Sequence, residues 1–286
     1  MKLVTYLYNG NEYPGALVNN DAFVVPLPYA DMNELIDNVP CEKLCTLLDE
    51  VKGEAIPISR VKLLSPIPRP RQDLICLGLN YLDHAEETAR KDGNSTDVKA
   101  VATYFEKRVR KASGPDDDIP SYVGFVKELD YEAELGVIIS KNAFNVTKEN
   151  ARNCIFGYTI INDVSARRIQ AEHGGQWFFG KSLDGFCPIG PCILTADSVE
   201  YPLKADITCY VNGELRQKSN TSLLIHKVDE IISEISQGIE LLPGDIISTG
   251  TPAGVGMGYD PPKFLKPGDE VVCIIDGIGT LRNKVK

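Results

Sequence analysis

Long apolar stretches are absent from this sequence. No run approaches the roughly 18 consecutive apolar residues that a helix needs to span a bilayer, although 43% of the 286 residues are hydrophobic, as in an ordinary globular protein. The first ten residues also lack the pattern of a secretory signal, because polar residues interrupt the apolar stretch that follows the single lysine. We therefore expect a soluble cytoplasmic protein with no membrane partner.

Basic charge is scarce as well. The chain has 30 lysines and arginines against 40 aspartates and glutamates, which gives a formal net charge of −10. A field of this sign repels nucleic acids and anionic membranes and so excludes them as partners. A small anionic substrate would need local positive charge, which a metal ion and a few basic side chains could supply.

The cysteines lack the paired CxxC spacing that is typical of a zinc site. The chain has eight, and the closest pairs are Cys41 with Cys45 and Cys187 with Cys192. In a cytosolic protein, reduced core thiols are favoured over a disulfide or a metal site.

No nucleotide-binding motif is present either. Residues 250–258 are rich in glycine, but they fit neither GxGxxG nor GxxxxGK[ST] followed by a helix. Two interpretations remain open for this segment. It is either a mobile turn or a loop whose backbone N–H groups hold a carboxylate.

The chain length permits one large core, or a main domain with a small appendage. The first part of the chain combines short alternating segments with a helical stretch near Met32 to Val51, and it ends in the proline-rich segment Pro66 to Pro70. We predict a small N-terminal α+β domain with a linker over residues 1–70. A catalytic domain follows over residues 71–286.

The larger domain is strand-heavy with few helices, which predicts a β-rich α+β fold. Asn212-Gly213 and Asp276-Gly277 predict type I′ hairpins. Apolar residues at helical spacing from Val228 to Leu242 predict one amphipathic helix. The polar residues 91–122 are interpreted as a loop or lid. The other expected elements are strands at Leu74–Leu77, Tyr131–Ser140 and Tyr158–Ile161 and a short helix over Asn80–Arg90.

The sharpest local feature is Glu132-Ala133-Glu134, within an otherwise apolar strand. Residues i and i+2 of a strand share a face, so these carboxylates repel each other unless a cation lies between them. Asp163, at the end of another expected strand, is a candidate third ligand. Hard carboxylate ligands favour Mg²⁺ or Mn²⁺. A solvated strand face is the alternative interpretation of the same spacing.

Two further features are candidates for chemistry. His84 and Glu87, at i,i+3 on the expected helix, could form a base and its orienting carboxylate. A structural role is the alternative for His84, and it is favoured for His173 and His226. Lys181 could serve a substrate carboxylate or an enolate, or it could be an exposed loop lysine.

From about Leu74 to the C-terminus, these segments resemble the fumarylacetoacetate hydrolase family. The resemblance rests on a series of short motifs that occur in the family's order. They are Gly78-Leu79-Asn80-Tyr81-Leu82-Asp83-His84, Asp130-Tyr131-Glu132-Ala133-Glu134-Leu135, Asn162-Asp163-Val164-Ser165-Ala166-Arg167, Phe179-Gly180-Lys181-Ser182, Asn220-Thr221-Ser222, Ser236-Gln237-Gly238, Leu242-Pro243-Gly244-Asp245 and Ser248 to Gly256.

The resemblance implies a mixed β-sheet roll, usually a homodimer, with Mg²⁺ or Mn²⁺ on Glu132, Glu134 and Asp163. It implies that His84 and Glu87 activate water under a mobile lid. The positions that it puts around the substrate are Lys181, Arg167, Gln170 and Thr251, with Tyr81 and Lys107 as further candidates.

The sequence departs from the family pattern in two places. Leu79 stands where many relatives have arginine, and residues 91–122 are unusually rich in charge.

The expected substrate is a small 2-oxo acid that chelates the metal, so that charge developing on its oxygen is stabilised as an enolate. The His84–Glu87 pair favours hydrolysis of a C–C bond in a 2,4-dioxo acid such as an acylpyruvate or fumarylpyruvate, with Lys181 steadying the negative charge. The alternatives are an oxaloacetate-type decarboxylase, a 2-hydroxymuconate-type isomerase, and a non-catalytic protein that binds metal or ligand.

Overall fold

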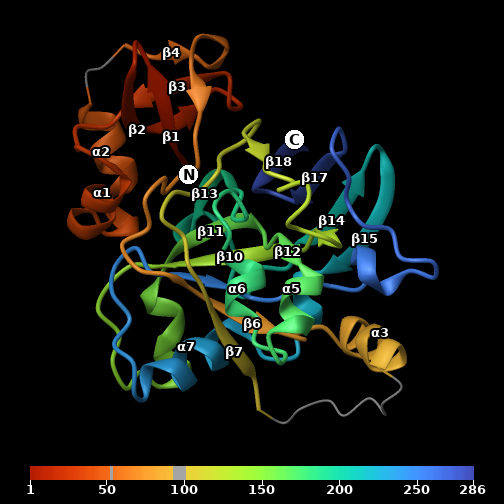
Figure 1. Cartoon of the computed structure of the whole chain (residues 1–286). Helices are drawn as coiled ribbons and strands as arrows, with labels where there is room; N and C mark the ends of the chain where they lie inside the picture. Colours follow the sequence, from red (N-terminus) through yellow and green to blue (C-terminus); the bar gives the residue numbers. More distant parts are fainter. Residues whose placement is uncertain (52–53, 93–100) are drawn as a thin grey trace.

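One mixed sheet of eleven strands runs through the molecule (Figure 1), and the strand-rich α+β fold expected from the sequence is confirmed. The structure is a computed structural model that describes residues 1–51, 54–92 and 101–286. The strand order is β4-β3-β2-β1-β13-β11-β10-β16-β6-β7, with β5 also paired to β1. Because β1 pairs with β13, the N-terminal strands belong to the same sheet as the later ones.

The N-terminal part consists of short strands and short helices. The helical stretch expected near Met32 to Val51 is present, but it is divided at Pro40, which lacks the N–H that a continuous helix needs. The elements are β1 (Lys2–Tyr8), β2 (Asn11–Val18), β3 (Phe23–Pro26), α1 (Met32–Asn38), η1 (Cys41–Lys43), α2 (Leu44–Glu50), β4 (Ile56–Pro57), η2 (Ile58–Arg60) and β5 (Lys62–Leu63).

The centre of the large sheet is covered on both faces. Every residue of β10 and β11 is buried, which explains why these strands are almost continuously apolar. A glutamate in β10 is therefore a costly residue that needs a partner. The central strands are β6 (Leu74–Gly78), β7 (Thr103–Lys107), β10 (Ala133–Ile139), β11 (Ile155–Asn162), β13 (Ile189–Thr195) and β16 (Ile246–Ser248).

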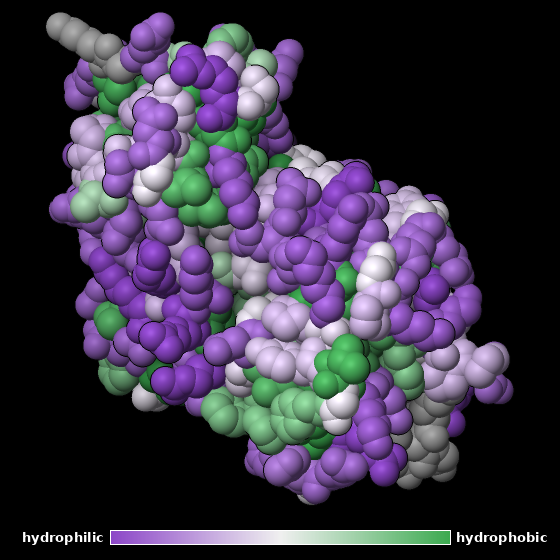
Figure 2. Space-filling model, turned by 45° about the horizontal axis from the view of Figure 1, so that its top comes forward, coloured by the Kyte–Doolittle hydropathy of each residue, from purple (hydrophilic) through white to green (hydrophobic). Residues whose placement is uncertain are grey.

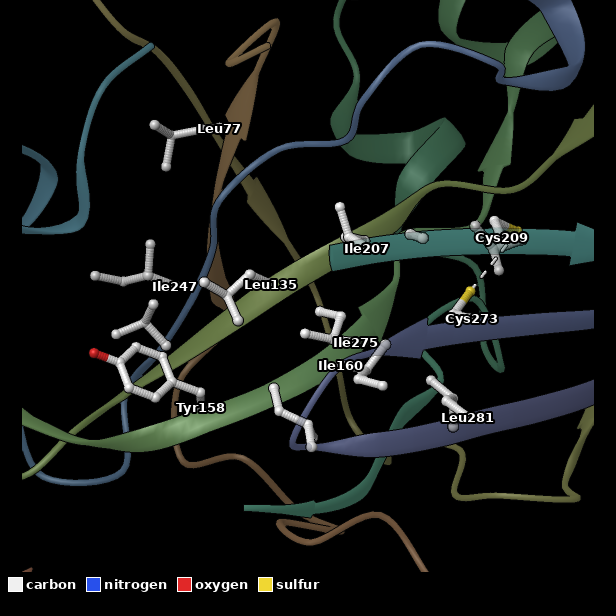
Figure 3. Close-up of a cluster of buried hydrophobic side chains, with 14 of the residues drawn as sticks. Leu77, Leu135, Tyr158, Ile160, Ile207, Cys209, Ile247, Cys273, Ile275 and Leu281 are labelled. Carbon is white, nitrogen blue, oxygen red and sulfur yellow. Dashed lines mark hydrogen bonds between the residues drawn. The ribbon is translucent and has the colours of Figure 1, made fainter. Parts of the chain in front are cut away.

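A second sheet of five strands packs on the first, and the main core lies between them. Figure 3 shows Leu135 and Ile160 of the large sheet close to Ile207 and Ile275 of the second. The strands, in spatial order, are β15 (Glu214–Asn220), β14 (Asp206–Val211), β17 (Glu270–Ile275), β18 (Gly279–Val285) and β8 (Asp118–Ile119).

Both expected hairpins are confirmed in this second sheet. Asn212 and Gly213 have φ angles of 51° and 79°, as a type I′ turn requires. The other turn differs from the expected two-residue type, because residues 276–278 lie between the strands.

The cysteines are free, as expected, and six of the eight are buried. Cys209 and Cys273 face each other across β14 and β17 with their sulfur atoms 3.9 Å apart.

Two sequence predictions need correction. The amphipathic helix ends at Ser236 rather than at Leu242, because Leu241 instead pairs with Ala143 in a β-bridge. The proposed lid over 91–122 contains β7 and β8, and its residues 93–100 lie outside the described part. The remaining elements are α3 (Leu82–Asp92), β9 (Leu129–Asp130), α4 (Lys148–Ala151), η3 (Arg152–Cys154), β12 (Ser165–Ala166), α5 (Arg167–Glu172), α6 (Phe178–Lys181), η4 (Ala196–Ser198), η5 (Thr221–Leu223), α7 (Val228–Ser236) and η6 (Gly256–Gly258).

The molecular surface has mixed character. The face in Figure 2 is largely hydrophilic, with hydrophobic side chains gathered in separate patches. Among the described helices, none combines the length and the apolar character needed to cross a membrane.

Candidate metal centre

Three buried carboxylates converge where β10 begins and β11 ends. Ala133 pairs with Asn162, and the N–H of Asp163 donates to the carbonyl oxygen of Glu132 at 2.8 Å, which brings the flanking acids together. One oxygen each of Glu132, Glu134 and Asp163 lies within 4.8 Å of the other two, and the three residues are 5%, 0% and 0% exposed. The solvated-face interpretation of these acids is therefore wrong.

Basic side chains surround this acidic group. Lys181 Nζ lies 2.5 Å from Glu132 Oε2 and 2.6 Å from Asp163 Oδ2. Lys107 Nζ lies 2.7 Å from Asp163 Oδ1. Both lysines are buried, so the exposed-loop interpretation of Lys181 is also wrong.

Arg167 is the third basic residue beside the acidic group. Its Nη2 donates to Glu132 Oε1 at 2.6 Å, and its Nε donates to Asp130 Oδ2 at 2.9 Å. Buried ion pairs of this kind are tolerated only where every charge has partners.

Glu132 and Glu134 differ in proton affinity. Burial opposes ionisation of Glu132, but Lys181 and Arg167 outweigh it and lower the pKa of Glu132 to about 2. Burial, together with the charges of Asp163 and Glu132, raises the pKa of Glu134 to about 8. Among the described residues no basic side chain forms an ion pair with Glu134, which explains the difference. Its Oε2 accepts from Ser248 Oγ at 2.6 Å and from Gly250 N at 2.9 Å.

The group fits a divalent metal ion. Oε1 of Glu134 is buried and has no hydrogen-bond partner in the part of the chain that the structure describes, and a cation would satisfy this acceptor. All three candidate ligands are hard oxygen donors. Together with Asp130, the site has four buried carboxylates, and its three cations are Lys107, Arg167 and Lys181. A divalent ion would therefore change the net charge of the site from −1 to +1, the sign that an anionic ligand requires.

A histidine and a glutamate lie beside the acidic group. His84 Nδ1 is 3.0 Å from Glu87 Oε2, and both residues come from α3, one turn apart. When Nδ1 carries the proton and donates it to the carboxylate, Nε2 is left as the acceptor nitrogen. This geometry is that of a base and the group that orients it.

The glycine-rich segment 250–258 holds carboxylates through its backbone, which was one of its two interpretations. Gly254 N donates to Glu87 Oε1 at 3.0 Å. Gly256 N and Met257 N donate to Asp130 at 2.6 and 3.1 Å. The carboxylates held here belong to the protein itself.

A cavity of about 330 Å³ opens onto these groups. Its volume is at the lower end of the range for small-molecule sites. Its ionisable lining residues are His84, Glu132, Glu134, Arg167 and Lys181. The other lining residues are Leu77, Gly78, Leu79, Thr88, Phe105, Gln170, Ala171, Gly175, Trp177, Thr251 and Met257.

Four of the site residues expected from the sequence lie outside this lining: Glu87, Asp163, Tyr81 and Lys107. Tyr81 and Lys107 are each 0% exposed. Lys107 donates to the backbone carbonyls of Val164 and Lys181, so it is a buried support for the acidic group.

Sequence reasoning gave no role to Asp130, Phe105 or Trp177. Asp130 was visible as an acid two residues before Glu132, but nothing in the sequence showed that it binds Arg167. Phe105 and Trp177 form an edge-to-face pair with ring centroids 5.1 Å apart. They come from segments far apart in the chain, and no periodicity links them.

The fold and these side chains define a strand-rich protein with an acidic metal-binding group in a cavity. The chain belongs to the fumarylacetoacetate hydrolase family, since residues 73–286 match the family model for the fumarylacetoacetate (FAA) hydrolase C-terminal region. The resemblance found in the sequence is thereby confirmed.

Relatives with named activities are enzymes. Oxaloacetate tautomerase YisK of Bacillus subtilis (strain 168) is 43% identical over 237 residues, or 83% of this chain and 77% of that protein. Fumarylacetoacetate hydrolase of Exiguobacterium antarcticum has a TM-score of 0.84 and 37% identity, covering 100% and 99% of the chains. Maleylpyruvate hydrolase of Sphingobium sp. SYK-6, solved with manganese(II) and pyruvate, has a TM-score of 0.79 and 30% identity, covering 100% and 98%.

Proposed function

We propose that this protein is a divalent-metal-dependent enzyme that moves a proton at the carbon beside the 2-oxo group of a small 2-oxo acid. The first candidate reaction is interconversion of the enol and keto forms. The observation that carries the proposal is that His84, oriented by Glu87, opens onto the same cavity as Glu132 and Glu134. The 43% identity to an oxaloacetate tautomerase supports the choice of reaction.

The base is His84. Its Nε2 removes a proton from C3 of the keto acid, and Glu87 stabilises the imidazolium that forms. Return of that proton to the oxygen at C2 gives the enol, and the reverse sequence gives the keto form. The proton that His84 removes is returned to the same molecule, so the reaction needs one base and no further reactant.

The metal is Mg²⁺ or Mn²⁺, held by Glu132, Glu134 and Asp163. When bound, it supplies a Lewis acid that stabilises negative charge at the 2-oxo oxygen. The carboxylate donor set favours these ions over softer ones. Manganese(II) in the structure of the maleylpyruvate hydrolase supports the same choice.

Other side chains bind and orient the substrate. Arg167 and Lys181 are the cations of the cavity lining, so they attract the substrate carboxylate and the developing oxyanion. Gln170 and Thr251 line the same cavity as uncharged polar groups. The Thr251 hydroxyl also donates to the carbonyl oxygen of Ala133 at 3.0 Å, which fixes its position against β10.

Hydrolysis of a C–C bond in a 2,4-dioxo acid is the second candidate. The same pair, His84 and Glu87, would then activate water for attack on the distal carbonyl group, and the enolate would be the leaving group. The likeness to a maleylpyruvate hydrolase supports this alternative. An oxaloacetate-type decarboxylase and a hydroxymuconate-type isomerase need the same enolate stabilisation, but decarboxylation needs no base.

The test is a substrate panel of oxaloacetate, an acylpyruvate, fumarylpyruvate and a hydroxymuconate, with Mg²⁺, Mn²⁺ or a chelator. Wild type is compared with Glu132→Ala and His84→Asn. We expect metal-dependent enol–keto interconversion that both variants lose. Turnover of the acylpyruvate alone would favour the hydrolase. Absence of metal-dependent turnover of every compound would favour a protein that only binds metal or ligand.

We also propose that the protein acts as a homodimer, as the family resemblance implies, and that it does so in the cytoplasm. Size-exclusion chromatography with light scattering tests the assembly. A monomeric mass at micromolar concentration would contradict it.

A further inference from the structure

Asp130 is a buried carboxylate with an unusually complete set of donors. Oδ1 accepts from Tyr131 N at 2.9 Å and Gly256 N at 2.6 Å, and Oδ2 accepts from Arg167 Nε at 2.9 Å and Met257 N at 3.1 Å. The residue is 0% exposed. It lies outside the cavity lining, so its influence on a ligand must pass through its neighbours.

Arg167 is the neighbour through which that influence can pass. Its guanidinium group is planar and carries its donors in a fixed fork. Asp130 holds Nε and Glu132 holds Nη2, and these two contacts fix the plane and its rotation. Arg167 lines the cavity, and within the described residues no hydrogen bond or ion pair engages its Nη1.

The glycine-rich segment ties this arrangement to the base. Gly254 N holds Glu87, and Gly256 N, two residues later, holds Asp130. A Cβ at residue 256 would lie 2.5 Å from Asp130 Oδ1, so only glycine permits this approach. One short segment therefore sets the positions of both Glu87 and Asp130.

We propose that Asp130 is a positioning residue that turns the Nη1 edge of Arg167 into the cavity, where it binds the carboxylate of the 2-oxo acid. The proposal rests on the proposed function for the nature of the ligand. Asparagine cannot replace Asp130, because its amide has one acceptor oxygen and its NH2 group would face either Arg167 and Met257, on the Oδ2 side, or Tyr131 and Gly256, on the Oδ1 side. In the first orientation Arg167 loses the acceptor of its Nε, and in the second the NH2 group repels the two backbone N–H groups that hold residue 130 in place. In both orientations Arg167 loses the negative charge that faces it.

The experiment is a double-mutant cycle with Asp130→Asn, Arg167→Gln and the double variant. The dissociation constant of pyruvate is measured by calorimetry in saturating Mn²⁺, after circular dichroism has confirmed folding. We expect Asp130→Asn to weaken pyruvate binding by about 10- to 100-fold, as for other groups that orient ligand-binding residues. Because Asp130 acts through Arg167, the double variant should lie within about twofold of Arg167→Gln. If the factors by which the two single substitutions weaken pyruvate binding multiply in the double variant, the proposal is overturned.

A second variant covers failure of Asp130→Asn to fold. Arg167→Lys keeps the charge, but one ammonium group cannot hold Asp130 and Glu132 and also present a fork to the ligand. Pyruvate binding should weaken by about tenfold or more. Unchanged affinity would overturn the proposal.

The matched control is Asp245→Asn. The Asp245 carboxylate accepts the Leu242 N–H at 2.8 Å and contacts neither Arg167 nor the glycine-rich segment, so pyruvate affinity should stay within about twofold. Wild-type protein that binds Mn²⁺ but no pyruvate would contradict the proposed function instead. In that case, urea unfolding of wild type, the two single variants and the double variant tests the Asp130–Arg167 contact. Additive losses of the free energy of unfolding would overturn the positioning role, and non-additive losses would support it.

Discussion

Metal affinity should depend steeply on pH because Glu134 must lose a proton to act as a ligand. Its pKa is raised to about 8 by burial and by the charges of Asp163 and Glu132, so the metal-free carboxyl group is mostly protonated at pH 6 to 7. Metal binding releases this proton. The affinity for the metal should therefore rise by about tenfold per pH unit below pH 8 and level off above that value.

The expected change is large enough to measure directly. Between pH 8 and pH 6, the ionised fraction of a group with a pKa of about 8 falls by about fiftyfold, which corresponds to about 2 kcal/mol of binding free energy. Calorimetric titration with Mn²⁺ in buffers of different ionisation enthalpy gives both the affinity and the number of protons released. We expect close to one proton per ion at pH 6.5.

Two variants separate Glu134 from other titrating groups. Glu134→Gln has no proton to release, so it should bind Mn²⁺ more weakly and with little dependence on pH. His84→Asn removes the nearby histidine without touching a ligand, so it should keep the slope of the wild type. A wild-type affinity that is flat from pH 6 to 8, or a slope that Glu134→Gln retains, would refute the reasoning.

Three further predictions concern stability and the supports of the site. Lys107→Met should lower the free energy of unfolding by about 3–5 kcal/mol in urea titrations, because it leaves Asp163 buried with one cation fewer. Gly258→Ala should lower kcat by about tenfold or more at unchanged Mn²⁺ affinity, because the new Cβ would lie 2.0 Å from Glu87 Oε1. A chelator should lower Tm more at pH 8 than at pH 5, because Glu134, whose pKa is raised, destabilises the metal-free fold as it ionises with rising pH.

The two substitutions each have a control variant. Lys62 pairs with Asp117 at an exposed site, so Lys62→Met should cost no more than about 1 kcal/mol. Gly238 has open space where its Cβ would lie, so Gly238→Ala should leave kcat unchanged. Equal effects in variant and control, or an equal loss of Tm on chelation at both pH values, would contradict the corresponding prediction.

The three candidate metal ligands could be predicted from local sequence, partly because strand periodicity determines which residues share a face. Glu132 and Glu134 followed from a spacing of two, and Asp163 followed from its place after an apolar strand. The pairing of β10 with β11 then brings Asp163 beside Glu132. Pairing partners are not encoded in the spacing of either strand, so the convergence itself needed the structure.

The cations could not be placed by the same reasoning. Lys107 and Lys181 come from β7 and α6, and both reach Asp163 although 74 residues separate them in the chain. Lys181 therefore resembled an exposed loop lysine in the sequence. Asp130 was overlooked because its partners Arg167 and Gly256 lie 37 and 126 residues away in the sequence.

The boundaries of helices and strands were least predictable where apolar residues at helical spacing form tertiary contacts outside a helix. Ile239 and Leu242 fall at helical spacing after Val228, yet α7 ends at Ser236. Leu241 forms a β-bridge to Ala143, and Ile239 is 59% exposed. Tertiary pairing here overrides the local pattern.

The most direct test of the central claim is exchange of the methyl protons of pyruvate with D₂O, followed by proton NMR with Mg²⁺ or with a chelator. Enolisation at a metal held by Glu132, Glu134 and Asp163, with His84 as the base, predicts exchange that requires Mg²⁺ and is lost in both Glu132→Ala and His84→Asn. Exchange no faster than in protein-free buffer with Mg²⁺, or exchange that His84→Asn leaves intact, would contradict this account.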